Sequence, residues 1–539
     1  MTTQGLTSTT TRIPIDIRRF PWINRLAADY AYGFGRLAPF FAGDPADPGA
    51  WRDAIARAQR HPRNRDAIAD VLAAQQRQRG APPEAIAAAA RLRDPKAIAI
   101  VTGQQAGLFG GPLFTLLKAL TAIRLAARVS EEHHVPAVPI FWIDAEDHDW
   151  DEVRSVGLFD AGMQLASVDI GTSDGSGQGP VARVRLDEQA AGAVAQLAAL
   201  MPATEFTPAL LDSLRSAYAP GAGMAEAFGR WLESVLGGLG LVVFDSSDPA
   251  AKPLAAPVFA REIEHAGETS RLAADAGAQL EALGYHAQVT PHVDQAALFH
   301  LNGGRQGIPA GGKREEMLAR VRSHPEEFSP NVLLRPIVQD TLFPTACYVA
   351  GPSELAYLGQ LAGIYAAFGV PMPLMQPRAS ATILDANAMR FLARHDIPFE
   401  SLRAQDEAAL NQLLEAQLPA SVDQSLEDVA RALVDRMEAL AAAVPQIDAT
   451  LEGAARSTLG RMQDDLKKLH GKIIQAAKRK DETLRRQFTH ARAQAFPGGH
   501  PQERTLGFVG FLNKYGPGFV ERVGDDLPLD IGTHWVMTI

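Results

Sequence analysis

Short apolar runs that end in polar or glycine residues recur between residues 97 and 378 of the chain. They are AIAIV at 97–101, PIFWI at 139–143, LVVF at 241–244, TACYVA at 345–350 and VPMPLM at 370–375. Continuous apolar runs of this length are typical of strands buried on both faces of a parallel sheet, and helical patterns lie between them. The pattern therefore predicts an α/β fold with a doubly wound parallel sheet.

Two stretches interrupt this alternation of strands and helices. Residues 153–239 begin with β-like segments and continue with helical patterns, and residues 285–343 contain a β-like segment, a glycine loop and a helix. We interpret both as insertions into the core. The core itself then consists of residues 1–152, 240–284 and 344–399.

The pattern changes between residues 400 and 495, where apolar residues recur at spacings of three and four, as in the a/d seam of a coiled coil. The seam comprises Leu426, Val429, Leu433, Met437 and Leu440, then Leu459, Met462, Leu466, Leu469, Ile473 and Leu484. Pro445 lies between the two runs and predicts the turn of an antiparallel helical hairpin. One hairpin cannot hide so many apolar positions, which indicates a homodimer through the coiled coil. Residues 496–539 are expected to pack back on the core.

Length, net charge and cysteine content exclude several classes of protein. The chain has 539 residues, which suits two or three domains, and its net charge of −10 argues against general nucleic-acid binding. The amino terminus lacks an apolar signal core, and no uninterrupted apolar run is long enough to span a membrane, so we expect a cytoplasmic protein. The one cysteine, Cys347, lies inside an apolar run. We expect it to be a buried thiol and not a nucleophile.

A glycine-rich loop, GQQAGLFGG at 103–111, follows the first predicted strand. Its glycines permit positive φ angles and close approach of the backbone to a ligand. The helix that follows could hold an anion, either a phosphate or a carboxylate, at its N-terminus. Lys118 would add a positive charge there, and Gln104 and Gln105 would add donors. The spacing matches neither the dinucleotide fingerprint nor the P-loop, so a plain tight turn is the alternative.

A cluster of acidic residues around one histidine, DAEDHDWDE at 144–152, follows the second predicted strand. Carboxylates this close raise one another's pKa unless a cation or donors intervene. The cluster therefore suits a metal ion, an ammonium group or general-base catalysis, the alternative being a solvated loop before a helix that starts near Glu152. Because ligands bind beyond the carboxyl ends of parallel strands, we expect His148 and Gln104 to share one pocket.

Several longer motifs occur in order along the chain. They are GQQAGLFGGPLFTLLKA, PIFWIDAEDHDWDEV, SPNVLLRPIVQDTLFPTACYVAGPSELAY, MPLMQPR, KRKDETLRRQ and FLNKYGPGF. Together they resemble the bacillithiol biosynthesis cysteine-adding enzymes, the BshC family of cysteine ligases, from about residue 14 to the end. The resemblance implies a Rossmann-like core with two connecting-peptide insertions and a C-terminal coiled coil used for dimerisation. It also implies the last step of bacillithiol synthesis, in which cysteine is joined to the amine of glucosaminyl malate by amide formation.

The resemblance and the residues together indicate a candidate site. The catalytic candidates, which would take the amine proton or hold the cysteine ammonium, are His148, Glu146, Asp147 and Asp149. The substrate-binding candidates are Gln104, Gln105, Gly107, Gly111, Thr115, Lys118, Trp142, Arg335, Glu354, Tyr357 and Arg378. A nucleotide, ATP or ADP with magnesium, is the implied cofactor. Its candidate contacts are Lys478, Arg479, Lys480, Asn513 and Lys514, although a basic run on a coiled coil is commonly a solvated face.

Two other functions fit parts of the same pattern. A metal-dependent hydrolase would use the acid-histidine cluster to hold a divalent cation, and it would bind that cation without a nucleotide. A non-catalytic scaffold would use the coiled coil alone and would keep its function after both loops were replaced. No residue is assigned to a resident metal on the ligase interpretation.

Overall fold

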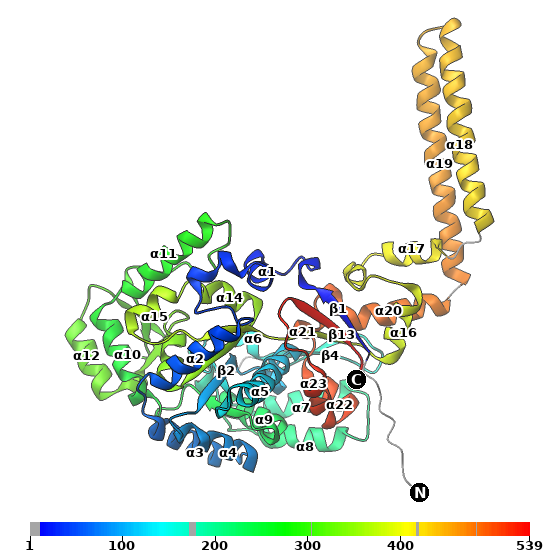
Figure 1. The fold of residues 1–539 in the computed structure, drawn as a ribbon. Coiled ribbons are helices and arrows are strands. Elements are labelled where there is room, and N and C mark those ends of the chain that lie inside the picture. The colour runs from blue at the N-terminus through cyan, green and yellow to red at the C-terminus, as the bar shows by residue number, and fades with distance from the viewer. Residues whose placement is uncertain (1–10, 172–178, 303, 417–419, 481) are drawn as a thin grey trace. The chain divides into compact units, whose positions relative to one another are not determined.

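The computed structural model describes residues 11–171, 179–302, 304–416, 420–480 and 482–539 (Figure 1). Residues 1–383 and 501–539 form one compact unit, and residues 384–500 form a second. The second unit extends beyond residues 400–495 at both ends, the range predicted for the coiled coil. Within the described ranges, no helix has both the length and the apolar character needed to cross a membrane.

A five-stranded parallel sheet lies at the centre of the first unit. Its strands, in spatial order, are β11 (Leu374–Pro377), β10 (Thr345–Ala350), β2 (Ile98–Gln104), β3 (Ala137–Ile143) and β6 (Val242–Asp245). Each overlaps one of the apolar runs, so the predicted doubly wound α/β sheet is confirmed. Gln104 pairs with Ile143, which places the loops after β2 and β3 at one edge of the sheet.

Alternate residues of each strand pack on opposite faces of this sheet. Ile98 and Ile100 face a cluster with α2 (Pro48–Arg60) and α5 (Leu113–His133). Ala99 and Val101 face the other way, into a cluster shared with the second insertion. The other amino-terminal helices are α1 (Arg25–Tyr32), α3 (Arg65–Arg79) and α4 (Pro83–Ala90). Burial on both faces explains why the strands are apolar throughout.

The first insertion, between β3 and β6, is a hairpin followed by helices. Its elements are α6 (Trp150–Val153), β4 (Ser155–Phe159), β5 (Leu165–Asp169), α7 (Glu188–Leu200), α8 (Thr207–Ala217) and α9 (Met224–Leu236). Strands β4 and β5 pair antiparallel and form a sheet separate from the central one.

The segment between β6 and β10 contains the second insertion, residues 285–343, which carries its own small sheet. Helices α10 (Lys252–Glu264) and α11 (Glu268–Ala282) precede this insertion, and α12 (Arg314–Ser323) and α13 (Arg335–Leu342) lie within it. Its strands β7 (Gln295–His300), β8 (Gln306–Pro309) and β9 (Phe328–Pro330) pair antiparallel in the order β8-β7-β9. The chain then returns to the central sheet through β10, α14 (Pro352–Leu358), α15 (Ala362–Phe368) and β11.

Two segments far apart in the chain meet in a fourth sheet. Its strands are β1 (Arg12–Asp16), β13 (Thr533–Met537) and β12 (Ser380–Ile383), with β13 in the middle. The C-terminal segment also contributes α21 (Gln502–Thr505), α22 (Phe508–Tyr515) and α23 (Gly518–Asp526) to the first unit. Within that unit, α21 lies next to α5 and β12 (Figure 1).

The second unit contains the predicted helical hairpin. Helices α18 (Ala420–Ala443) and α19 (Leu451–Lys480) run side by side in opposite directions, with Pro445 in the turn between them (Figure 1). The unit is completed by α16 (Ala386–His395), α17 (Ala408–Glu415) and α20 (Glu482–Ala495). The coiled-coil prediction is therefore confirmed.

Candidate functional site

A cavity of about 720 Å³ opens beyond the carboxyl ends of β2, β3 and β10. The strand ends supply Gln104, Trp142 and Asp144, and α14 supplies Glu354. Further lining residues come from the second insertion and the C-terminal segment, namely Arg305, Asn331, Arg335 and Arg504. Ligands are expected at this edge of a parallel sheet, because the loops after neighbouring strands diverge there.

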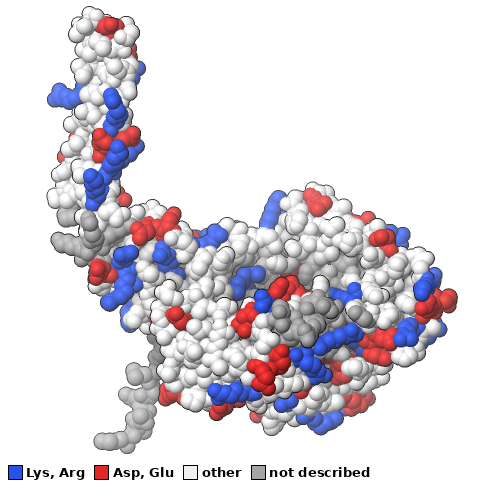
Figure 2. All heavy atoms as spheres, turned by 180° about the vertical axis from the view of Figure 1, so that it is seen from behind, with Lys and Arg blue, Asp and Glu red and all other residues white. Residues whose placement is uncertain are grey.

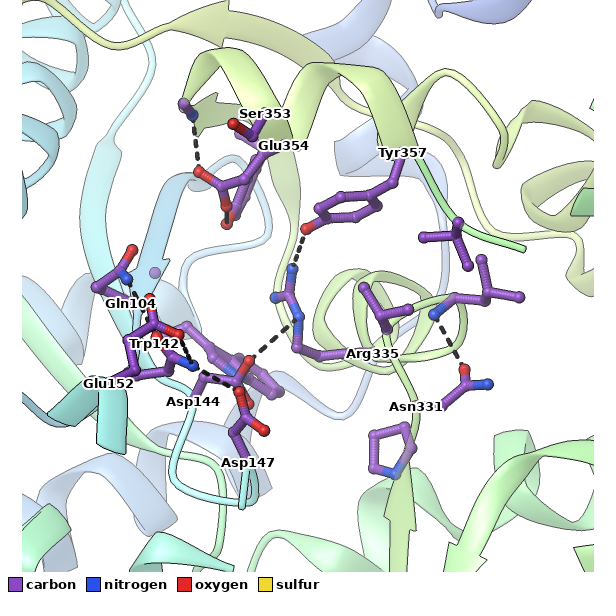
Figure 3. Close-up of a pocket in the computed structure, with 18 of the residues that line it drawn as sticks. Gln104, Trp142, Asp144, Asp147, Glu152, Asn331, Arg335, Ser353, Glu354 and Tyr357 are labelled. Atoms are coloured by element: carbon purple, nitrogen blue, oxygen red, sulfur yellow. Dashed lines mark hydrogen bonds and ion pairs between the residues drawn. The ribbon is translucent and has the colours of Figure 1, made fainter. Parts of the chain in front are cut away.

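Three carboxylates line the part of the cavity nearest β3: Asp144, Asp147 and Glu152 (Figure 3). The Gln105 Nε2 group donates to Asp147 Oδ2 at 2.6 Å and to Glu152 Oε2 at 2.8 Å, which holds these two carboxylates together. Burial alone would raise the pKa of Asp147. The Gln105 amide, the backbone N–H of His148 and the Arg305 guanidinium outweigh that effect, so the pKa is lowered. Asp147 therefore stays ionised at neutral pH.

Asp144 lies beside this pair in a different electrostatic setting. Its burial raises the pKa of the carboxyl group above its ordinary value, and Arg335 opposes the rise only in part. The Arg335 Nε atom is 3.9 Å from Asp144 Oδ2. A carboxylate with a raised pKa is a better proton acceptor at neutral pH than one held in its charged form. Asp144 was part of the acidic motif but was not among the catalytic candidates.

Arg335, predicted to bind substrate, lines the cavity as one member of a buried network. Its Nη2 atom donates to the Tyr357 hydroxyl at 2.9 Å (Figure 3). Its Nη1 atom donates to Gln339 Oε1 at 3.2 Å. With Asp144 near its Nε atom, every side of the guanidinium has a protein partner. Arg335 therefore shapes the wall of the cavity and orients Asp144.

Arg378 and Arg504 form the basic edge of the cavity. Arg378 makes a bidentate, buried ion pair with Glu503, with N···O distances of 2.8 and 2.5 Å. Arg504, the next residue along the chain from Glu503, lies over the same Phe114 ring as Arg378, with distances of 5.8 and 5.5 Å from the two guanidinium carbons. Arg504 forms no ion pair with any residue that the structure describes. Its guanidinium is therefore available to an anionic ligand.

The first residues of the glycine loop, Gly103, Gln104 and Gln105, line the cavity, but the later residues predicted to bind a ligand do not. Gly107, Gly111 and Thr115 are buried and lie outside the lining of the cavity. The loop packs against its own chain, because a Cβ atom at Gly110, whose φ is +92°, would be 2.2 Å from the Phe508 ring. The first N–H of α5, on Leu113, donates to the Leu506 carbonyl at 2.7 Å. The C-terminal segment thus occupies the place predicted for an anion.

The residues of the acid-histidine cluster also have different contacts and different roles. Glu146 is buried in an ion pair with Lys252 of α10, facing away from the cavity lining. Asp149 caps α6 by accepting a hydrogen bond from the Glu152 backbone N–H at 3.1 Å. His148 has 62% of its side chain exposed, and its Nδ1 atom is 3.1 Å from Arg305 Nη1. His148 and Gln104 therefore do not share the cavity, whereas Asp147 and Gln104 do.

The residues proposed for a nucleotide are spread over both units. Asn513 is buried; its Oδ1 atom accepts from the Thr207 hydroxyl at 2.7 Å, and its Nδ2 atom donates to the Pro202 carbonyl at 2.9 Å. Asn513 thus joins α22 to the first insertion, and both polar atoms of its side chain bond within the protein. Lys514 lies over the Tyr515 ring. The side chains of Lys478, Arg479 and Lys480 are outside the described part of the chain.

Cys347 is completely buried in β10, at the centre of the sheet. Burial raises the pKa of its thiol far above the ordinary value. We therefore expect Ellman's reagent to leave the native protein unmodified and to titrate one thiol per chain after unfolding in guanidinium. Rapid modification of the native protein would contradict the burial. Replacing Cys347 with alanine should leave ligand binding unchanged.

Arg305 and Arg504 have no sequence signal comparable with the motifs. Arg305 is a single arginine between β7 and β8, Arg504 is one in the short helix α21, and only the fold brings them to the strand ends. Arg504 follows Glu503 shortly before the FLNKYGPGF motif, and this proximity was the one available indication. Glu152 was predicted as a helix start and lines the cavity as well.

Comparisons with known proteins agree with the fold. The family model described as the bacillithiol biosynthesis BshC N-terminal Rossmann-like domain matches residues 10–379, and the one for the BshC C-terminal coiled-coil domain matches residues 381–539. A Salinibacter ruber protein named "Putative cysteine ligase BshC" is 33% identical over 529 residues, 95% of this chain and 96% of that protein. The protein of the same name from Koribacter versatilis is 34% identical over 527 residues, 95% and 97% of the two chains. The chain therefore belongs to the bacillithiol biosynthesis BshC family.

Proposed function

We propose that this protein is the cysteine ligase of bacillithiol biosynthesis, which joins the carboxylate of cysteine to the amine of glucosaminyl malate in the last step of the pathway. Its family membership supports this assignment. The observation that carries it is the cavity itself, where three carboxylates and an available guanidinium line one space. An amino acid and a sugar bearing an amine and a malyl group need this combination of charges.

The carboxylates would act on the two amines. Asp147 and Glu152, which share the Gln105 amide, would hold the ammonium group of cysteine, because Asp147 stays ionised and Glu152 places a second carboxyl group beside it. The amine of glucosaminyl malate must lose a proton before it can attack. Asp144, with its raised pKa, would accept that proton. Arg335 would keep Asp144 in place and would limit the rise of its pKa.

The malyl carboxylates would bind at the basic edge of the cavity. Arg378 is committed to Glu503, so Arg504 would supply the bidentate contact, stacked with Arg378 over Phe114. A free carboxylate must be activated before an amide can form, and we propose ATP with magnesium as the co-reactant that supplies this activation. The closed glycine loop and the committed Asn513 do not fit the phosphates, so the described residues act on the amines and carboxylates only.

Deletion of the gene tests the assignment directly. Thiol profiling of cells that lack it should show glucosaminyl malate accumulating and bacillithiol disappearing, with both reversed when the gene is restored. The purified protein should then form bacillithiol from cysteine, glucosaminyl malate and ATP. Unchanged bacillithiol in the deletion strain would contradict the proposal. Hydrolysis of an amide or a phosphoester with a divalent cation alone would support a hydrolase instead.

We further propose that the hairpin α18–α19 makes the protein a homodimer. Several predicted seam residues stay exposed on the single chain, with Val429 at 53%, Leu440 at 49%, Met462 at 43% and Leu469 at 50%. Figure 2 shows uncharged surface between the charged groups of this hairpin. Apolar side chains repeated along a helical hairpin favour pairing with a second copy.

Sedimentation velocity should therefore give a dimer for the full chain at micromolar concentration. The double substitution Val429→Asp with Leu469→Asp should give a monomer, because charges cannot be buried unpaired at the interface. Gln446→Asp, at the turn of the hairpin, is a control that adds a charge outside the seam and should leave the dimer intact. A full chain that sediments as a monomer would disprove this arrangement.

A further inference from the structure

Lys118 lines the cavity, but its ammonium group has no N–H left to donate to a ligand. Its side chain is 97% buried, and its Nζ atom lies 2.7 Å from the Gly103 carbonyl, 3.1 Å from Gln104 Oε1 and 2.5 Å from Glu354 Oε2. An ammonium group has three donors and no acceptor. All three donors are used by the protein, which differs from the substrate contact predicted from the sequence.

Glu354 keeps Lys118 in this place. Its Oε2 atom also accepts from the Gly351 backbone N–H at 2.7 Å, at the start of α14, and its Oε1 atom accepts from the Tyr348 hydroxyl at 2.8 Å. The carboxylate is therefore fixed at both oxygens. Because the cation and its counterion are both held by the backbone or by a buried ring, neither can swing toward a ligand.

This arrangement fixes the orientation of the Gln104 amide. A carboxamide can ordinarily turn by 180°, which exchanges its oxygen and its NH2 group. Lys118 can only donate, so the oxygen of Gln104 must face it. At the other end, Gln105 must present its NH2 group to Asp147 and Glu152, since ionised carboxylates only accept. The oxygen of Gln105 therefore faces Gln104 Nε2, at 3.4 Å.

One N–H of Gln104 is left over at the wall of the cavity. The amide has two N–H groups, and only the long contact with Gln105 uses one of them. In the described part of the chain the second has no acceptor. We propose that Lys118 is a positioning residue that makes Gln104 an obligatory donor, so that Gln104 binds an acceptor oxygen of the substrate, a carbonyl or carboxylate. This inference rests on the proposed ligase function for the identity of the substrate.

The proposal also defines what the site rejects. A ligand group that can only donate, such as an ammonium, would meet the N–H of Gln104 and not its oxygen. The ammonium group of cysteine therefore belongs beside Asp147 and Glu152, and an oxygen of a substrate belongs beside Gln104. Lys118 contributes to this separation without touching either substrate.

Binding of glucosaminyl malate and of cysteine, measured by calorimetry, tests the inference with two variants. Gln104→Glu keeps an oxygen for Lys118 and replaces the N–H with an acceptor, and it should weaken binding of the ligand at this position about 10- to 100-fold. Lys118→Met with Glu354→Gln removes the clamp without leaving an unpaired buried charge, and it should weaken binding less, because the freed amide can still turn toward the ligand. Gln279→Glu, on the exposed face of α11, is the charge-matched control and should bind normally.

The coupling between the variants separates positioning from simple structural support. When the clamp is absent, Gln104→Glu should cost less than it costs in the wild-type protein, because the donor is no longer held in place. Strictly additive losses, or normal binding of both substrates by Gln104→Glu with an unchanged unfolding midpoint, would overturn the inference and leave the ligase assignment intact. A wild-type protein that binds neither substrate would instead overturn the proposed function and the inference with it.

Discussion

Replacement of Arg378 with methionine is expected to lower the free energy of unfolding by about 3–5 kcal/mol, the usual cost of removing one partner of a buried ion pair. The Arg378 and Glu503 side chains are 3% and 7% exposed. Without the guanidinium, Glu503 would keep only the Ser380 hydroxyl at 3.1 Å and the weak Ala381 N–H contact at 3.4 Å. Urea titration followed by circular dichroism measures the loss.

The double variant Arg378→Met with Glu503→Leu provides the control for that experiment. Replacing both charges with apolar groups of similar size is often neutral, so this variant should recover most of the lost stability. If the Arg378→Met variant were as stable as the wild-type protein, solvent would have to reach Glu503. Equal loss in the single and double variants would mean that packing, and not charge, causes the effect.

The same ion pair predicts an acid-sensitive part of the stability. Burial alone would raise the pKa of Glu503, but Arg378 outweighs it and lowers the pKa from 4.5 to about 2. A carboxyl group with a depressed folded pKa stabilises the fold above its unfolded pKa, and this contribution is lost as the pH falls to the folded value. The wild-type protein should therefore lose this contribution between pH 4.5 and about 2. The double variant should not.

Replacement of Asp144 with asparagine is expected to lower the turnover number of bacillithiol formation by about 10²–10⁴-fold, the usual contribution of a general base. The Michaelis constant for cysteine should change much less, because the proposed ammonium contacts at Asp147 and Glu152 remain. Asp147→Asn should have the opposite effect on the two kinetic constants: the Michaelis constant for cysteine should rise, and turnover should fall less than in Asp144→Asn. Steady-state kinetics with each substrate varied in turn distinguishes the two.

The pH dependence provides a second readout for Asp144. Its raised pKa means that turnover should fall as the pH drops through that pKa, and the Asp144→Asn variant should lack this limb. His148→Ala serves as the matched control, since His148 is exposed and outside the cavity lining, and its turnover should stay close to that of the wild-type protein. If His148→Ala abolished turnover while Asp144→Asn did not, the assignment of the base would be wrong.

The sheet could be predicted from the sequence because its strands are buried on both faces, which makes each of them a continuous apolar run. The helical hairpin was equally accessible through the spacing of its leucines and through Pro445. Both features depend on local patterns of burial. The position of the cavity followed from the sheet, since loops at the carboxyl ends of neighbouring parallel strands must lie together.

The roles of individual residues in the cavity were harder to predict. Glycines reveal that something approaches the backbone closely, but they do not reveal what, and at Gly110 it is Phe508 of the same chain. The acidic motif contains structural and cavity-lining carboxylates side by side, because Glu146 meets Lys252 and Asp144 meets Arg335 only after folding. Arg504 lies far along the chain from the strands it serves. Tertiary contacts of this kind leave no periodic pattern.

The pairing of β1 with β13 bears on how the protein can be made in the cell. Ile15 near the beginning pairs with His534 near the end, and Arg504 reaches the cavity from the same late segment. During synthesis the central sheet can form first, but β1 lacks its partner and the glycine loop lacks Phe508 until almost the whole chain has emerged. Nascent chains would expose this apolar surface to chaperones and proteases, and those stopped before residue 500 would lack Arg504 at the basic edge. The cavity is therefore completed only by chains that have been synthesised past Arg504.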